Sequence, residues 1–259
     1  MRMRLLTGVV AVALLLSGCV VARPLETIPR ETEPVETAAP TVAAPPTAPT
    51  VPIHSPYYIP GLDVETLITY FNEIVLDAEF VEGGDATLVQ KWDEKILYYI
   101  HGETTETDMT VFQSMVDWLN TLPGFPGMGP AENEAAANMQ IYFTDYRGLQ
   151  DRMGEKYAGN DGAVIFWYQD HRIYDATVCY VTEVDQETRN SIILEEIYNG
   201  LGPVQDTWLR EDSLVYAGYS TPQSMTEVDR LILTLLYHPD IQCGMNSEEC
   251  ATVIRQLYY

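Results

Sequence analysis

Two adjacent carboxylates and two nearby oxygen-bearing side chains offer the most concentrated chemistry in this sequence. Glu195 and Asn199 are one helical turn apart, Glu196 lies beside Glu195, and Asp206 follows shortly after. Oxygen ligands at this spacing suit Ca²⁺ or Mg²⁺, and a carboxylate can also serve as a general base. Charges along a helix are more often only its solvated face, so we expect Glu195 and Glu196 to be surface charges with no cofactor.

Zinc chemistry finds no support in the histidines. They are His54, His101, His171 and His238, and no two of them are spaced as a ligand pair on one helix face. A zinc hydrolase needs three protein ligands to hold the metal and activate its water. The sequence therefore predicts no zinc site.

Other nucleophiles have ordinary explanations. No G-x-S-x-G motif occurs, and Ser213 and Ser220 have no neighbouring histidine, so both are expected to be plain loop serines. The run Asp170–Arg172 resembles an acid–base cluster, but a turn between two apolar strands also needs polar residues. We expect a turn there.

Three cysteines remain besides Cys19, namely Cys179, Cys243 and Cys250. The short separation of Cys243 and Cys250 predicts a local disulfide between them. Cys179 lies in an apolar strand and is expected to be a buried free thiol, although its pairing with either of the others stays open.

Hydrophobic spacing and capping residues define the elements that must position these groups. The predicted helices cover 63–80, 107–122, 185–201, 226–237 and a last segment from Asn246, with a polar helix or loop over 146–157, and the predicted strands cover 91–100, 139–143, 163–168 and 173–181. The last two strands form a hairpin. The fold class is α+β, with a mixed sheet packed against helices.

The N-terminus combines Arg2 and Arg4 with an apolar run, 5–16, that is too short to span a bilayer, and then Ser17-Gly18-Cys19. This pattern resembles the signal peptides of bacterial lipoproteins. The resemblance implies cleavage of residues 1–18 and a diacylglycerol on Cys19. It places the protein outside the cytoplasm, anchored to a membrane by lipid.

Residues 19–60 are expected to form a disordered tether, because ten of the 16 prolines fall between Val20 and Pro60 among Thr and Ala. Residues 61–259 then form one domain. The net charge of −24 and the presence of only three lysines exclude nucleic acid as a partner. Such acidity also disfavours direct binding to anionic lipids, so attachment depends on Cys19.

The region around Glu196 resembles zinc metallopeptidases of the zincin kind. Aligned with H-E-x-x-H-x-x-G-x-x-H, the run 195–205 keeps the general-base glutamate as Glu196 and the turn glycine as Gly202. Glu195, Asn199 and Gln205 stand where histidines would bind zinc. The resemblance implies a zincin-like sheet and helix in which the metal ligands have been lost.

A closer resemblance joins Glu195-Glu196 and 200–202 with the segments 226–229, 236–240 and 244–245. Together they resemble the bacterial family called domain of unknown function 2927. That resemblance implies an exported or lipid-anchored protein with a zincin-like fold and no established activity.

Two functions from different classes follow. In the first, a non-catalytic zincin-like domain binds a peptide or partner protein, because strand addition to a sheet edge needs no metal. In the second, the protein is a hydrolase with an unconventional site centred on Glu196. We expect the first, because every ligand position is altered.

Overall fold

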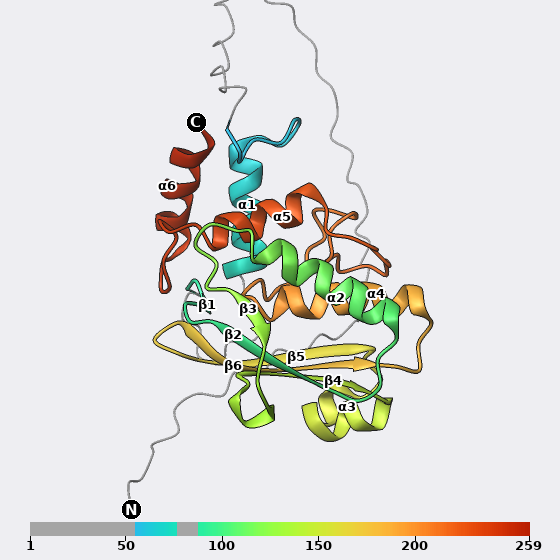
Figure 1. Cartoon of the computed structure of the whole chain (residues 1–259). Helices are drawn as coiled ribbons and strands as arrows, with labels where there is room; N and C mark the ends of the chain where they lie inside the picture. Colours follow the sequence, from blue (N-terminus) through green and yellow to red (C-terminus); the bar gives the residue numbers. More distant parts are fainter. Residues whose placement is uncertain (1–54, 77–87) are drawn as a thin grey trace, which may run out of the picture.

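The computed structural model describes residues 55–76 and 88–259 (Figure 1). The predicted signal peptide, Cys19 and most of the predicted tether lie outside these residues, as does the end of the first predicted helix. The described chain forms a six-stranded mixed sheet with helices against it. This arrangement confirms the predicted class of a mixed sheet packed on helices.

The sheet is parallel at every pairing except one. Strands β2 and β4 occupy its centre, β4 pairs with β6, and β3 pairs with the outer side of β2. The exception is β5, which runs antiparallel to β6. The strands are β1 Lys91–Trp92, β2 Ile96–His101, β3 Met128–Pro130, β4 Met139–Thr144, β5 Gly162–Gln169 and β6 Arg172–Val181.

The predicted hairpin is confirmed by β5 and β6. Its two turn residues, Asp170 and His171, have φ values of 51° and 63°. Positive φ at both central positions is the requirement of a type I′ turn, whose twist matches that of the flanking strands. The expectation of a polar turn at this point is therefore met.

Two features of the sheet differ from the predictions. The single strand expected over 91–100 is two strands, because the chain turns through exposed residues 93–95 and changes neighbour from β6 to β4. Strand β3 was not predicted, since its Gly129 and Pro130 have low strand propensity. Parallel pairing with β2 creates β3, and such a long-range partner leaves no local signal.

The helices begin at the predicted caps. Asp185, Thr226 and Asn246 each accept hydrogen bonds from backbone N–H groups in the first turn that follows. A side-chain oxygen at this position satisfies a donor that the helix itself leaves unpaired. The α-helices are α1 Val64–Leu76, α2 Glu106–Leu119, α3 Tyr146–Met153, α4 Gln186–Asn199, α5 Glu227–Leu236 and α6 Ser247–Tyr258.

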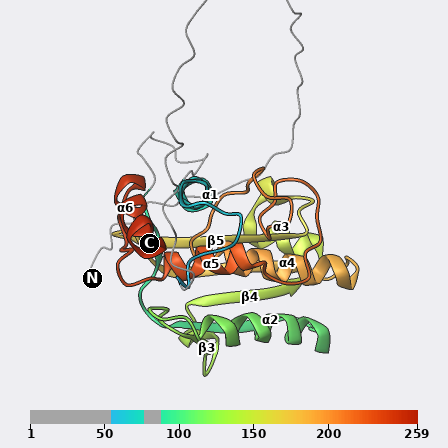
Figure 2. The same ribbon diagram turned by 90° about the horizontal axis from the view of Figure 1, so that it is seen from above.

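The two faces of the sheet are covered unequally (Figures 1 and 2). Helices α1, α2, α4, α5 and α6 contribute to one large core on one face, whereas α3 alone packs on the other with a small core. The small core contains Leu149, Ala163 and Cys179. Part of the second face therefore has no helix of the described chain over it.

Residues just before Gly61 already contact the domain. The Ser55 hydroxyl donates to the Leu257 carbonyl at 3.0 Å, and the Tyr57 ring lies edge-on to His238 with centroids 5.9 Å apart.

Within the described residues, none of the helices has the length and apolar character needed to cross a membrane.

Candidate functional site

Helix α4 carries the residues of the motif on the side of the sheet that holds the large core. Asp185 caps it by accepting from the Thr188 N–H at 3.0 Å. After its end, Gly202 has φ of 125°, and a Cβ there would lie 2.4 Å from the Gln90 carbonyl oxygen. Only glycine fits this conformation and this close approach. The chain beyond α4 therefore lies directly against the segment that leads into β1.

Glu196 points from α4 onto the first residue of β5. Its side chain is 9% exposed, and a Cβ added to Gly162 would lie 2.9 Å from Glu196 Oε1 and 2.2 Å from Ile192 Cγ2. Glu195 is half-buried. The expectation of a solvated helix face is wrong for this pair. Apolar residues surround α4 on several sides near Glu195 and Glu196, so the helix has no fully solvated face there.

Burial controls the protonation of these carboxyl groups. It raises the pKa of Glu196 well above its ordinary value, and the nearby charges of Glu195 and Asp206 raise it further. Burial, with Asp206 as a second cause, also raises the pKa of Glu195. Asp206 has a pKa of about 6, again through burial. The surroundings of Glu196 therefore favour its neutral form.

The positions aligned with zinc ligands do not assemble a metal centre. Nowhere in residues 55–76 and 88–259 do three Asp, Glu, His or Cys side chains gather as a metal site. Asn199 Oδ1 is buried without a hydrogen-bond partner in the same part of the chain. The Gln205 N–H donates to the Ile74 carbonyl at 3.2 Å, which ties this residue to α1.

The three histidines within the described residues belong to three different elements or turns. His101 stacks on Tyr142 on the second face of the sheet, with ring centroids 4.2 Å apart. His171 is in the hairpin turn, and His238 follows α5. His54 is outside the described residues.

The predicted disulfide is wrong: Cys179, Cys243 and Cys250 are all free thiols. Cys250 lies in the first turn of α6, which Asn246 caps, and its side chain is fully buried. The Cys243 thiol instead lies 3.8 Å from the Lys91 carbonyl oxygen. Short sequence separation does not make two side chains face each other. Cys179 is buried, as expected, and burial raises its pKa to about 12.

Two other buried polar groups are parts of the scaffold. Arg189 Nε donates to Asp108 Oδ1 at 2.8 Å and so joins α4 to α2. Ser213, expected to be an ordinary loop serine, is buried and donates to Asp229 Oδ1 at 2.8 Å. It also accepts from the Tyr70 hydroxyl at 2.7 Å. These closed networks have satisfied partners and fix the positions of helices.

Among the residues that the structure describes, strand β5 pairs only with β6, so its other side is a sheet edge beside α4. Asp161 accepts from the Val181 N–H at 2.8 Å. Because antiparallel strands alternate their bonding, the backbone groups of Gly162, Val164 and Phe166 point away from β6. The strand from 163 to 168 contains neither charge nor proline, the usual devices that protect an edge.

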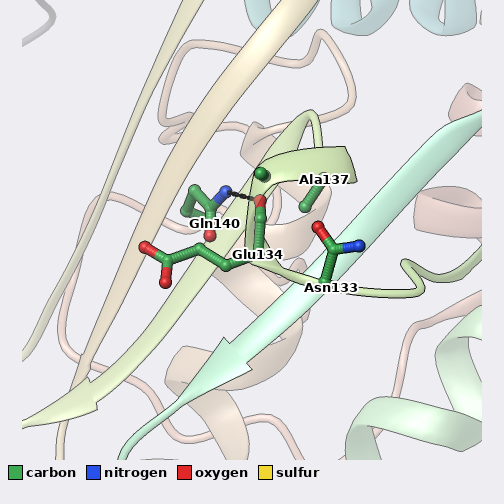
Figure 3. Close-up of a pocket in the computed structure, with 5 residues that line it drawn as sticks. Asn133, Glu134, Ala137 and Gln140 are labelled. Atoms are coloured by element: carbon green, nitrogen blue, oxygen red, sulfur yellow. Dashed lines mark hydrogen bonds between the residues drawn. The ribbon is translucent and has the colours of Figure 1, made fainter.

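The second face of the sheet carries residues that the sequence did not single out. A pocket of about 550 Å³ lies there between the segment after β3 and strand β4, lined by Asn133, Glu134, Ala135, Ala137 and Gln140 (Figure 3). Gln140 Nε2 donates to the Glu134 carbonyl at 3.0 Å. One pattern in the sequence could have indicated this face: aromatic and amide side chains alternate with core residues, at a period of two, along β2 and β4.

Comparison with known proteins adds the family. A search of curated proteins finds none that matches this chain. The family model described as "Protein of unknown function (DUF2927)" matches residues 64–256, which include every helix and strand described above except the last two residues of α6. The chain belongs to the DUF2927 family.

Proposed function

We propose that this protein is a lipid-anchored envelope protein whose domain holds an extended peptide, or a segment of a partner protein, without cleaving it. The anchor rests on the sequence pattern that ends at Cys19. The binding role rests chiefly on one observation, the unprotected edge of β5 beside the motif helix. The likeness of the 195–205 run to a peptidase motif agrees with a peptide ligand.

A non-catalytic role is supported by the state of Glu196. A general base must be ionised and within reach of its water, whereas Glu196 is buried against Gly162 with a pKa well above the ordinary value. A neutral carboxylic acid cannot accept the proton. Peptide binding at β5 needs only backbone groups and is unaffected by this loss.

The edge of β5 is suited to strand addition in length and in composition. Its eight residues exceed the average strand and allow several backbone hydrogen bonds to a guest. Val164 packs near Gly200, since a Cβ on Gly200 would be 3.3 Å from Val164 Cγ2. The edge is therefore braced by α4 and does not need to reorganise when a peptide binds.

Hydrogen exchange tests this proposal at single amides. Peptides selected from a random library for binding to the full chain should slow exchange at Gly162, Val164 and Phe166, whose N–H groups point outward. The intervening Ala163 and Ile165 already bond to β6 and should change little. Peptides that bind without this alternating pattern would refute strand addition at β5.

A variant pair tests the same edge independently. Val164→Pro removes an outward N–H, which an edge strand tolerates, and should abolish peptide binding while the domain stays folded. Ile165→Pro removes an inward N–H and should destabilise the domain instead. Equal effects of the two substitutions on binding by folded protein would contradict the proposed geometry.

The hydrolase alternative has a direct test. We expect no cleavage of a broad peptide library above background, with or without added zinc or calcium. A cleavage activity that Glu196→Gln reduces by about two orders of magnitude or more would establish Glu196 as a catalytic base and overturn the non-catalytic proposal.

A further inference from the structure

The second face of the sheet presents a regular array of side chains. Strand register places them in three rows, each crossing from β2 through β4 and β6 to β5. Side chains at alternate positions share a face, and the core residues Ile96, Met139 and Val178 occupy the opposite one. The rows are His101–Tyr142–Cys179–Ala163, Tyr99–Gln140–Thr177–Ile165 and Leu97–Asn138–Asp175–Trp167.

Helix α3 covers the first row, and the other two rows remain partly open. Every side chain in those two rows is half-buried. The segment with Asn133 and Glu134 borders them and forms the wall of the 550 Å³ pocket, whose floor includes Gln140 (Figure 3). The face is therefore hollowed along one side and lined by aromatic, amide and carboxylate groups.

Asp175 is the one carboxylate set within these rows, and nothing in the described chain compensates its charge. No hydrogen bond or ion pair reaches it from residues 55–76 or 88–259, and burial alone raises its pKa to about 6. Its neighbour across the strands is Trp167. Neither of its carboxylate oxygens is among the side-chain atoms buried without a partner, so both are open to solvent and to a cationic ligand.

No cation of the described chain fills that place. Arg152 and Lys95 are basic side chains at this face. The Arg152 guanidinium lies 4.3 Å from the centre of the Tyr142 ring, with Nη1 donating to the Gly148 carbonyl at 3.0 Å, and Lys95 Cε would lie 3.9 Å from a Cβ on Gly129, the partner of Leu97. Glu134 adds a second carboxylate, which Figure 3 shows on the same side of the pocket as Gln140. Within the described residues, neither basic group forms an ion pair with Asp175.

We propose that this face binds an arginine side chain from a basic segment of a partner protein. The planar guanidinium stacks on Trp167 and pairs with Asp175, while Glu134 strengthens the attraction from the pocket wall. Arginine suits such a site better than lysine because it combines ring stacking with a forked donor set. The net charge of −24 favours the approach of a basic partner.

This inference concerns the face of the sheet and stands apart from strand addition at the edge of β5. Its test is a titration of isotope-labelled full chain with the blocked tripeptide acetyl-Gly-Arg-Gly-amide, followed by NMR. The control ligand replaces arginine with citrulline, which has nearly the same shape and no charge. We expect shift changes at Trp167, Asp175 and Gln140 with the arginine peptide, and at least fivefold weaker binding of the citrulline peptide.

Two substitutions on the same hairpin separate the site from the general acidity of the protein. Asp175→Asn should weaken arginine binding at least fivefold. Asp170→Asn removes an identical charge from the exposed turn, where asparagine tolerates the positive φ, and should change binding less than twofold. Thermal unfolding of Asp175→Asn should occur at the same temperature as wild type or higher, because an uncompensated charge is removed.

Three results would overturn the proposal. They are equal binding of the arginine and citrulline peptides, equal effects of the Asp175 and Asp170 substitutions, and shift changes scattered over the acidic surface. A neutral disaccharide that shifts the same residues while the arginine peptide does not would assign the face to a glycan ligand instead.

Discussion

At the scale of single residues, the balance between burial and hydrogen bonding decides what an enclosed carboxylate does. Asp108 is buried, which favours its neutral form, but bonds from Thr105, Gln186 and Arg189 lower its pKa overall. For Glu196, burial and the neighbouring carboxylates act in the same direction, and its pKa rises. The two environments therefore act in opposite directions: that of Asp108 favours a charged link between helices, and that of Glu196 favours the neutral acid.

The raised pKa of Glu196 predicts a pH-dependent loss of stability. In the unfolded chain a glutamate has a pKa of about 4.3, so as pH rises the unfolded state loses a proton that the folded state retains. This group's contribution is fully present below about pH 4 and declines by up to about 1.4 kcal/mol per pH unit until the folded pKa is reached. Glu196→Gln removes that dependence, so the variant should gain stability over wild type between pH 5 and pH 8.

Urea denaturation at pH 5, 6, 7 and 8 measures this difference. Glu187→Gln is the matched control, since it removes an exposed carboxylate from the first turn of the same helix. Its difference from wild type should stay constant across these pH values. Parallel curves for Glu196→Gln and wild type would show that Glu196 is ionised in the folded protein.

At the scale of the elements, local signals predicted the helices and long-range packing decided the site. Asp185, Thr226 and Asn246 mark helix starts because a cap bonds within its own turn. The burial of Glu196 depends on Gly162 in β5, which the sequence does not place beside α4. Strand β3, the division of 91–100 and the free state of Cys243 depend equally on distant partners.

Gly202 is the clearest point where an element depends on one residue. Its φ of 125° is strained for alanine, and the added Cβ would also meet the Gln90 carbonyl at 2.4 Å. Gly154 has a comparable φ of 101°, but a Cβ added there would have no atom within 4 Å. We expect Gly154→Ala to cost about 1 kcal/mol from backbone strain alone, and Gly202→Ala to cost about 3 kcal/mol or more. Chemical denaturation of both variants measures the two free energies, and equal losses would contradict the close contact at Gln90.

At the scale of the whole molecule, charge and attachment act against each other. The net charge of −24 repels anionic lipid headgroups, and the described residues contain no helix able to cross a membrane. A lipid on Cys19 would hold this acidic domain at the membrane despite that repulsion. Two acyl chains of a diacylglycerol give stable anchoring, which a single chain does not.

Cys19→Ala is therefore expected to move the protein from the membrane fraction to the soluble fraction. The apolar run 5–16 is too short to replace the lipid as an anchor. Fractionation by ultracentrifugation, with a wash at high salt, measures the distribution, and incorporation of labelled fatty acid measures the modification. Cys243→Ala is the matched control, because it removes a half-buried free thiol and should leave the protein on the membrane. Sedimentation of the Cys19 variant with membranes after the wash would show that another part of the chain provides the attachment.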